Sequence, residues 1–154
     1  MFGGENHPAK KISLEGAVTA NLYKVVAARA GYCCEYCHAP EALFNHRSPV
    51  DHIMPRVFGG SDDLDNLALA CHACNSHKYQ KQMAFDPRRK KSSRLFNPRR
   101  DKWHTHFTWN HSKTRIIGRT AVGRATVGAL NLNSERQIEA RILWQLLKKS
   151  RTGR

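Results

Sequence analysis

Residues 50–78 read VDHIMPRVFGGSDDLDNLALACHACNSHK, and this stretch combines ligands for two different kinds of metal ion. It begins with an acid beside a histidine, Asp51 and His52, and it ends with two cysteines that run into Asn75. Carboxylate and amide oxygens suit hard cations such as Mg²⁺, whereas thiolates suit zinc. The stretch therefore predicts that one set of ligands holds the fold together and that the other takes part in a reaction.

A second cysteine pair upstream supplies the rest of a zinc site. The segments Cys-Glu-Tyr-Cys and Cys-His-Ala-Cys form two C-x-x-C pairs with 33 residues between them. Two residues between cysteines allow a tight turn to aim both sulfurs at one ion, and a closed four-thiolate site is structural because it has no water ligand. Cys33 is expected to pack as a small apolar group, although it could replace its neighbour at a less usual spacing, and His38 and His72 are lesser alternatives. The expected structural Zn²⁺ ligands are Cys34, Cys37, Cys71 and Cys74.

The segments around these cysteines predict a small mixed fold. Residues 13–31 predict a helix that Ser13 caps and a glycine ends, because apolar side chains recur at helical spacing. Residues 49–53 and 67–71 are short and apolar enough for strands, and the loop between them supplies glycines and Asx side chains. Residues 73–83 lack helix breakers and predict a second helix.

The C-terminal half has a different composition. Residues 86–100 are basic and contain two prolines, and we expect them to run in extended form over a surface. Aromatic and polar groups alternate in residues 101–110, which predicts a strand whose aromatic side chains pack in the core, with base stacking as the alternative. Residues 115–130 fit either a hairpin or a short helix. Residues 133–150 predict a helix with Ser134 as its N-cap and an apolar stripe along one side.

Positive charge is concentrated in the same half. The chain has 26 Lys and Arg against 12 Asp and Glu, a net charge of +14. Residues 1–85 hold 8 basic and 8 acidic side chains, whereas residues 86–154 hold 18 basic and 4 acidic ones. Such a field attracts polyanions, and the planar fork of arginine suits phosphate, so the imbalance favours a nucleic-acid partner over a merely solubilising surface. The residues expected to follow a phosphate backbone are Arg88, Arg89, Lys90, Lys91, Arg94, Arg99 and Arg100.

The order of residues in the opening stretch resembles the motif of the HNH endonuclease family. The matching positions are Asp51-His52-Ile53, Pro55, Gly59-Gly60, Asn66-Leu67 and Cys71-x-x-Cys74-Asn75-x-x-Lys78. The resemblance covers roughly residues 30–80 and is to the variant in which a four-cysteine zinc site braces the fold. It implies an α+β fold with a ββα-metal (His-Me finger) core, to which flanking helices and a basic C-terminal extension are added.

The resemblance also implies a role for each matched polar residue. His52 corresponds to the general base that takes a proton from the attacking water. Asp51 and Asn75 correspond to ligands of one catalytic divalent ion, Mg²⁺ or Mn²⁺. Asn66 corresponds to an asparagine that braces the loop and orients the histidine. Neighbouring residues on a strand point to opposite faces, which agrees with different roles for Asp51 and His52.

Three further residues are weaker candidates for the site. His77 is a second choice as a ligand of the catalytic ion, Arg56 is a candidate for holding the phosphate that is cut, and Lys78 is expected to pack or to contact the substrate backbone. The expected enzyme nicks DNA, with RNA left open, and a double-strand break would need a homodimer, two events or a partner protein. The main alternative is a non-catalytic, zinc-finger-like nucleic-acid-binding protein. A disulfide-stapled secreted toxin is a third hypothesis.

The predicted organisation has three segments. They are a flexible arm at residues 1–12, the nuclease core with its N-terminal helix at residues 13–85, and a basic extension at residues 86–154 that packs on the core and contacts nucleic acid. No run of about eighteen apolar residues occurs, and no apolar stretch follows the first lysines, so we expect neither a membrane span nor a signal peptide. We expect a cytoplasmic protein of bacterial or phage-like origin.

Overall fold

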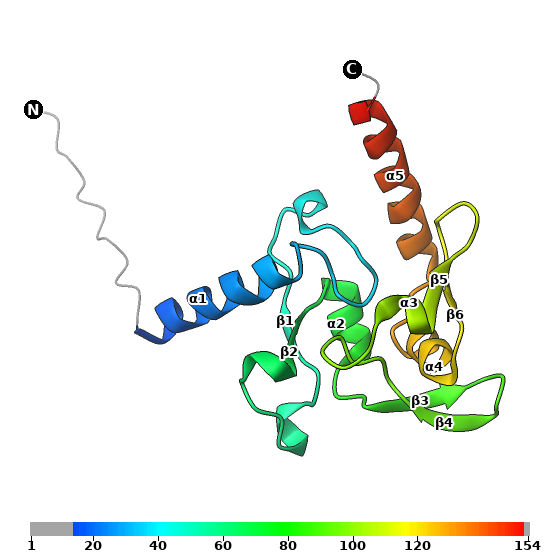
Figure 1. Ribbon diagram of the computed structural model, residues 1–154. Helices are drawn as coiled ribbons and strands as arrows, with labels where there is room; N and C mark the ends of the chain where they lie inside the picture. The colour runs from blue at the N-terminus through cyan, green and yellow to red at the C-terminus, as the bar shows by residue number, and fades with distance from the viewer. Residues whose placement is uncertain (1–13, 153–154) are drawn as a thin grey trace, which may run out of the picture.

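The computed structural model describes residues 14–152, so the predicted arm at residues 1–12 and the helix cap at Ser13 lie outside it. The first helix, α1, spans Leu14–Arg29, and Gly31 follows it with a φ of 58°. Glycine adopts this left-handed conformation without steric cost, so the helix ends where the sequence predicts. In Figure 1, α1 (blue) runs outward from the region of β1 and β2.

A short hairpin followed by a helix forms the centre of the fold. The strands β1 (Val50–His52) and β2 (Leu67–Leu69) pair antiparallel, with Asp51 opposite Ala68, and α2 (His72–Lys78) follows β2 closely. The apolar side of this hairpin packs against α1, and the buried residues at that packing surface are Val26, Ala27, Leu67 and Leu69. The predicted strands are confirmed, and the arrangement is the expected ββα unit of an α+β fold.

The second helix is shorter than the sequence predicts. It ends at Lys78 because Tyr79 has a φ of 47° and a ψ of −118°, which no helix accommodates. The chain then forms strand β3 (Met83–Asp86), so the prediction of a helix through residue 83 is wrong in its last part. Three single turns of 3-10 helix lie between α1 and α2, namely η1 (Glu41–Leu43), η2 (Arg56–Phe58) and η3 (Leu64–Asn66).

The C-terminal half folds into hairpins and helices. β3 pairs with β4 (Lys91–Arg94), and β5 (Phe107–Trp109) pairs with β6 (Ile116–Gly118). The helices of this half are α3 (Trp103–His106), α4 (Ala121–Ala129) and α5 (Glu135–Thr152). The basic segment at residues 86–100, expected to be extended over a surface, is instead partly built into the β3–β4 hairpin.

Tertiary contacts explain the other differences. Residues 101–110 begin as the helix α3 because the buried Trp103 donates a hydrogen bond of 3.0 Å from its indole Nε1 to the carbonyl of Tyr36. This hydrogen bond overrides the strand-like alternation of the sequence. Residues 115–130, which fitted a hairpin or a helix, contain both β6 and α4.

The last helix is confirmed, but its apolar stripe is only partly covered. The N–H of Gln137 lies 3.4 Å from Ser134 Oγ, as expected for an N-cap. Arg141 is buried and donates to the carbonyls of Thr114 and Leu132, which fixes the first half of α5 to the body. The C-terminal part of α5 projects away from the rest of the fold (Figure 1). The exposed apolar residues of α5 are Ile142, Leu143, Leu146 and Leu147.

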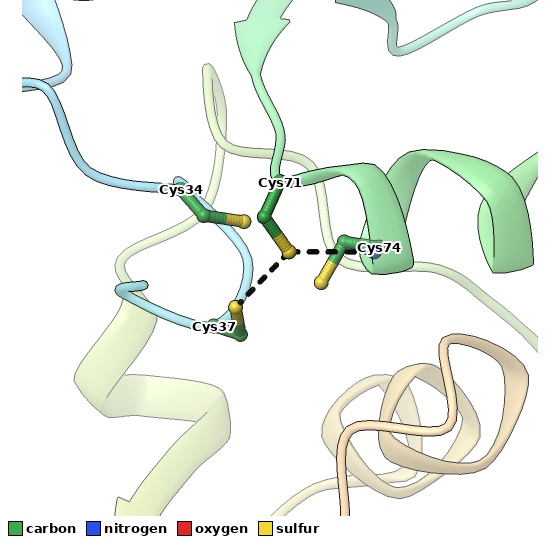
Figure 2. A group of neighbouring side chains, drawn as sticks. All are labelled: Cys34, Cys37, Cys71 and Cys74. Atoms are coloured by element: carbon green, nitrogen blue, oxygen red, sulfur yellow. Dashed lines mark hydrogen bonds between the residues drawn. The ribbon is translucent and has the colours of Figure 1, made fainter. Parts of the chain in front are cut away.

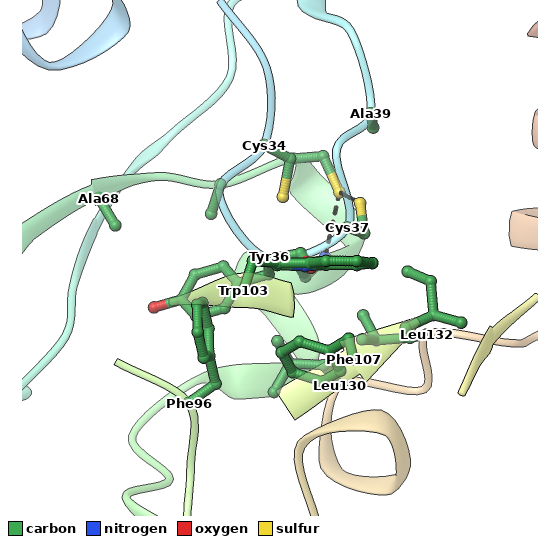
Figure 3. Close-up of a cluster of buried hydrophobic side chains, with 14 of the residues drawn as sticks. Cys34, Tyr36, Cys37, Ala39, Ala68, Phe96, Trp103, Phe107, Leu130 and Leu132 are labelled. Carbon is green, nitrogen blue, oxygen red and sulfur yellow. Dashed lines mark hydrogen bonds between the residues drawn. The ribbon is translucent and has the colours of Figure 1, made fainter. Parts of the chain in front are cut away.

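One core joins the cysteine segments to the C-terminal half. Figure 3 shows Cys34 and Cys37 above the ring of Trp103, with Phe107 and Leu130 beneath it. The aromatic residues Trp103 and Phe107 are buried and Trp109 packs against the same cluster, so the prediction of core packing is confirmed. The expected boundary after Phe85 falls inside β3.

Candidate functional site

Four cysteine side chains converge between the turn after α1 and the start of α2. The sulfur atoms of Cys34, Cys37, Cys71 and Cys74 all lie within 4.8 Å of one another, and all four residues are buried (Figure 2). The sulfurs of Cys37 and Cys71 are 3.6 Å apart. Thiolates around one zinc ion, each with a Zn–S distance of about 2.3 Å, would lie about 3.8 Å apart, so the cluster fits a tetrahedral structural zinc.

The cysteine thiols of the cluster lie so close together that the pKa values of Cys37, Cys71 and Cys74 are shifted. Hydrogen bonds from Cys34, Cys37 and Cys74 hold the pKa of Cys71 below its ordinary value, whereas hydrogen bonding with Cys34 raises the pKa of Cys37 and of Cys74. The cluster therefore needs a cation before all four groups can ionise together. Cys33 is only half-buried and stands outside the cluster, as predicted, and all five cysteines are free thiols, which disagrees with the disulfide-stapled hypothesis.

A cleft of about 400 Å³ lies beside β1 and α2 and contains the predicted reactive residues. Asp51 and His52 line it from β1, and Asn75 lines it from α2, one residue after the last cysteine of the cluster. Arg56 and Tyr79 also line this cleft. A larger cavity of about 810 Å³ lies on the other side of the loop, but neither His52 nor Asn75 lines it.

Asp51 is the most buried member of the cleft. Its Oδ2 accepts a hydrogen bond of 2.7 Å from the hydroxyl of Tyr36, and its Oδ1 accepts one of 3.0 Å from Nζ of Lys78. Burial raises the pKa of Asp51, while Lys78 and Tyr36 act in the opposite direction. Each carboxylate oxygen has two lone pairs, so each retains one acceptor site for a further ligand.

Lys78 does not reach solvent. Its side chain is 2% exposed, and Nζ also donates to the carbonyl of His52 at 2.8 Å, so Lys78 packs in the interior, which is the first of the two roles expected for it. The sequence contains a signal for this buried position. Lys78 follows Cys74 by four residues, and residues four apart share one face of a helix, so Lys78 lies on the inward face that carries Cys74.

His52 has a partner that the sequence did not reveal. Its Nε2 lies 2.7 Å from Oδ1 of Asp62, in the loop after the Gly-Gly turn. Arg56 binds the same carboxylate through Nε at 2.9 Å and Nη2 at 2.5 Å, and the hydrogen bonds from Arg56 and His52 lower the pKa of Asp62. Arg56 Nε is also 3.3 Å from His52 Nε2, but the shorter distance to the carboxylate favours Nε2–H as the donor to Asp62. Arg56 is therefore paired at the edge of the cleft.

Asn66 holds the loop that carries these groups. Its Oδ1 accepts from the N–H of Met54 at 2.8 Å, and its Nδ2 donates to the carbonyls of Met54 and Ser61 at 3.0 and 2.8 Å. Gly60 makes this closure sterically feasible, because a Cβ there would lie 1.8 Å from the carbonyl oxygen of Met54. The side chain of Asn66 thus joins the two sides of the loop, Met54 and Ser61, and Met54 is two residues after His52.

The two candidates on α2 differ in their surroundings. Asn75 is half-buried in the cleft, and none of the described residues hydrogen-bonds to its side-chain amide. His77 is exposed and lines a different cavity, of about 330 Å³, together with Phe44 and Trp144. The structure therefore brings Asn75, and not His77, into the cleft with Asp51 and His52.

The basic residues of the C-terminal half also separate into two groups. Residues 88–91 are all exposed at the turn of the β3–β4 hairpin, and Arg100 is exposed nearby in the sequence. Arg99 instead forms an ion pair with Glu35, and burial lowers its pKa to about 10. Arg94 pairs with Asp101 through two hydrogen bonds of 2.6 and 2.9 Å.

Comparison with known proteins agrees with this geometry. Residues 34–81 match the family model described as HNH endonuclease, a range that includes all four clustered cysteines and every residue of the cleft. No curated protein and no solved structure matches the chain. None of the helices in the described part of the chain is both long and apolar enough to span a membrane.

Proposed function

We propose that this chain, which carries an HNH endonuclease domain at residues 34–81, is a divalent-metal-dependent endonuclease that hydrolyses phosphodiester bonds in DNA and cuts one strand at a time. The observation that carries the proposal is the cleft shared by Asp51, His52 and Asn75, beside a four-cysteine cluster that fits zinc. A binding module would need the cysteines and the basic surface, but it would not need an imidazole, a carboxylate and an unpartnered amide in one cleft.

His52 is the general base. Its Nε2–H donates to Asp62, which leaves the lone pair on Nδ1 free to take a proton from the attacking water. A general base in this position typically contributes a factor of about 10² to 10⁴ in rate. Asp62 is a positioning residue, because it holds the tautomer and orientation of the ring rather than meeting the reacting atoms.

Asp51 and Asn75 are the proposed ligands of the catalytic ion. The donors are one carboxylate with a free acceptor site on each oxygen and one amide without a partner among the described residues, and hard oxygens in an incomplete shell suit Mg²⁺ or Mn²⁺. When bound, the ion supplies charge stabilisation for the scissile phosphate and the leaving oxygen. Lys78 and Tyr36 hold the carboxylate of Asp51 in place.

The zinc cluster and the basic hairpin have supporting roles. Four thiolates on zinc would fix the turn after α1 to the start of α2, which sets where Asn75 lies relative to β1. The exposed basic residues 88–91 supply charge for binding the phosphate backbone. One cleft of this kind cuts one strand per encounter, so a double-strand break needs a second copy or a partner.

The test is cleavage of supercoiled plasmid with Mg²⁺ or Mn²⁺, with and without a chelator. We expect nicked circles only with the divalent ion, and we expect Asn75→Ala to raise the metal concentration for half-maximal nicking by about tenfold or more. Asn45→Ala is the matched control, because Asn45 is exposed and lines a different cavity. Binding of DNA without cleavage under every metal would contradict the proposal and favour the non-catalytic alternative.

A further inference from the structure

Tyr79 has a backbone conformation that normally belongs to glycine. Its φ of 47° and ψ of −118° are those of the first central position of a type II′ turn, and the N–H of Lys81 donates to the carbonyl of Lys78 at 2.8 Å to close that turn. Glycine dominates this position because a Cβ is sterically unfavourable there. A residue with a large side chain is therefore strained at this point, whereas glycine would form the same turn without strain.

The fold gains no visible packing from this side chain. Tyr79 is 71% exposed, and no side chain that the structure describes hydrogen-bonds to its hydroxyl or stacks on its ring. Tyr79 lines the same cleft as His52 and Asn75, and it follows Asn75 by four residues at the C-terminal end of α2. Strain of this kind collects at functional sites, where the side chain has a use outside the fold.

We propose that Tyr79 is a positioning residue whose ring stacks on a nucleobase beside the phosphate that is cut. An exposed aromatic face at a nucleic-acid site binds bases without reading their sequence. A base must leave the duplex stack to present its face, so the inferred substrate class is DNA with an unpaired base beside the cut, such as a bubble or a single-stranded segment. The inference rests on the proposed function, since it takes the cleft of His52 as the place of cleavage.

Binding can be measured without cleavage. The background is His52→Ala, which leaves the DNA intact, and the ligand is a bubble oligonucleotide with 2-aminopurine placed at successive positions of one strand. Stacking on a tyrosine ring quenches the fluorescence of this base. Neighbouring DNA bases quench it as well, so the readout is the difference in quenching between the Tyr79 variants at the same position. The variants are Tyr79→Phe, which keeps the ring, and Tyr79→Gly, which removes the ring and suits the turn.

A second tyrosine offers the control. Tyr32 also has a positive φ, 55°, and is 51% exposed, but it lines a different cavity. We expect Tyr79→Gly to lose the quenching at one position, to bind the bubble about 5- to 100-fold more weakly, and to keep or raise the melting temperature. Tyr79→Phe is expected to behave as the parent, and Tyr32→Gly to keep both quenching and affinity.

Three results would overturn the inference. They are unchanged quenching and affinity in Tyr79→Gly, a loss in Tyr79→Phe as large as in Tyr79→Gly, or an equal loss in Tyr32→Gly. The same experiments distinguish failure of this inference from failure of the proposed function. If the wild type nicks plasmid while Tyr79→Gly binds normally, only the inference fails; if quenching depends on Tyr79 but no DNA is cut, only the proposed function fails.

Discussion

The buried ion pair between Lys78 and Asp51 allows a quantitative test of how the cleft is built. The two side chains are 2% and 5% exposed, and Nζ of Lys78 holds both the Asp51 carboxylate, at 3.0 Å, and the carbonyl of His52, at 2.8 Å. Lys78→Met retains a long unbranched side chain and removes the charge. It leaves the carboxylate buried with only the hydroxyl of Tyr36 as a partner.

The expected loss of stability is large. Removing one partner of a buried pair costs about 3–5 kcal/mol, because the remaining charge is neither solvated nor paired. For a domain of this size about 1 kcal/mol shifts the melting temperature by roughly 2–4 °C, so we expect a decrease on the order of 10 °C. Urea unfolding followed by circular dichroism gives the free energy directly.

The control is Lys81→Met, in the turn that follows α2. Lys81 is exposed and its Nζ donates to the carbonyl of His77 at 2.6 Å, so its substitution should change the free energy of unfolding by about 1 kcal/mol at most. In the double variant Lys78→Met/Asp51→Leu neither charge remains, and we expect the loss to be clearly smaller than the sum of the two single losses. If Lys78→Met were as stable as Lys81→Met, Lys78 would not be the buried partner of Asp51, and the cleft would not be built in the way described.

Three other predictions concern zinc, acid stability and DNA binding. The purified protein should contain one zinc ion per chain by metal analysis, and Cys34→Ser should lose it with the fold while Cys33→Ser keeps both; loss of zinc in both variants alike would contradict the ligand assignment. Hydrogen bonding from Arg124 lowers the pKa of Asp86 to about 2, below its unfolded value, so this carboxylate stabilises the fold above the unfolded pKa and the contribution is lost as the pH falls through about 2. The free energy of unfolding of Asp86→Asn should therefore depend less on pH between the unfolded pKa and about 2 than that of the wild type. An unchanged pH profile would reject Asp86 as the source of this acid sensitivity. Replacing residues 88–91 with serine should reduce the slope of log affinity against log salt by about 0.9 for each phosphate that these side chains neutralise, whereas an unchanged slope would place the DNA elsewhere.

Local patterns made the zinc cluster and the ββα unit predictable. The C-x-x-C spacing fixes two sulfurs by turn geometry alone, and the short apolar runs around residues 50 and 68 have the length and composition of paired strands. The cleft follows from these elements, because Asn75 comes directly after a clustered cysteine.

The remaining features depend on interactions between distant parts of the chain. The loop offers acids at positions 62, 63 and 65, and only the folded loop selects Asp62 as the partner of His52. Residues 101–110 alternate like a strand, but the hydrogen bond from Trp103 to Tyr36 turns their first half into a helix. The sequence also did not predict that α2 ends before Tyr79, because the glycine that usually marks such a turn is absent there.

The most direct test of the central claim is the initial rate at which supercoiled plasmid is nicked by His52→Ala, relative to the wild type at the same metal concentration. With His52 as the general base, the rate should fall by about 100-fold or more while the zinc content and the melting temperature stay unchanged. Equal rates for the two proteins would show that the imidazole takes no part in the reaction, and the proposed active site would be wrong.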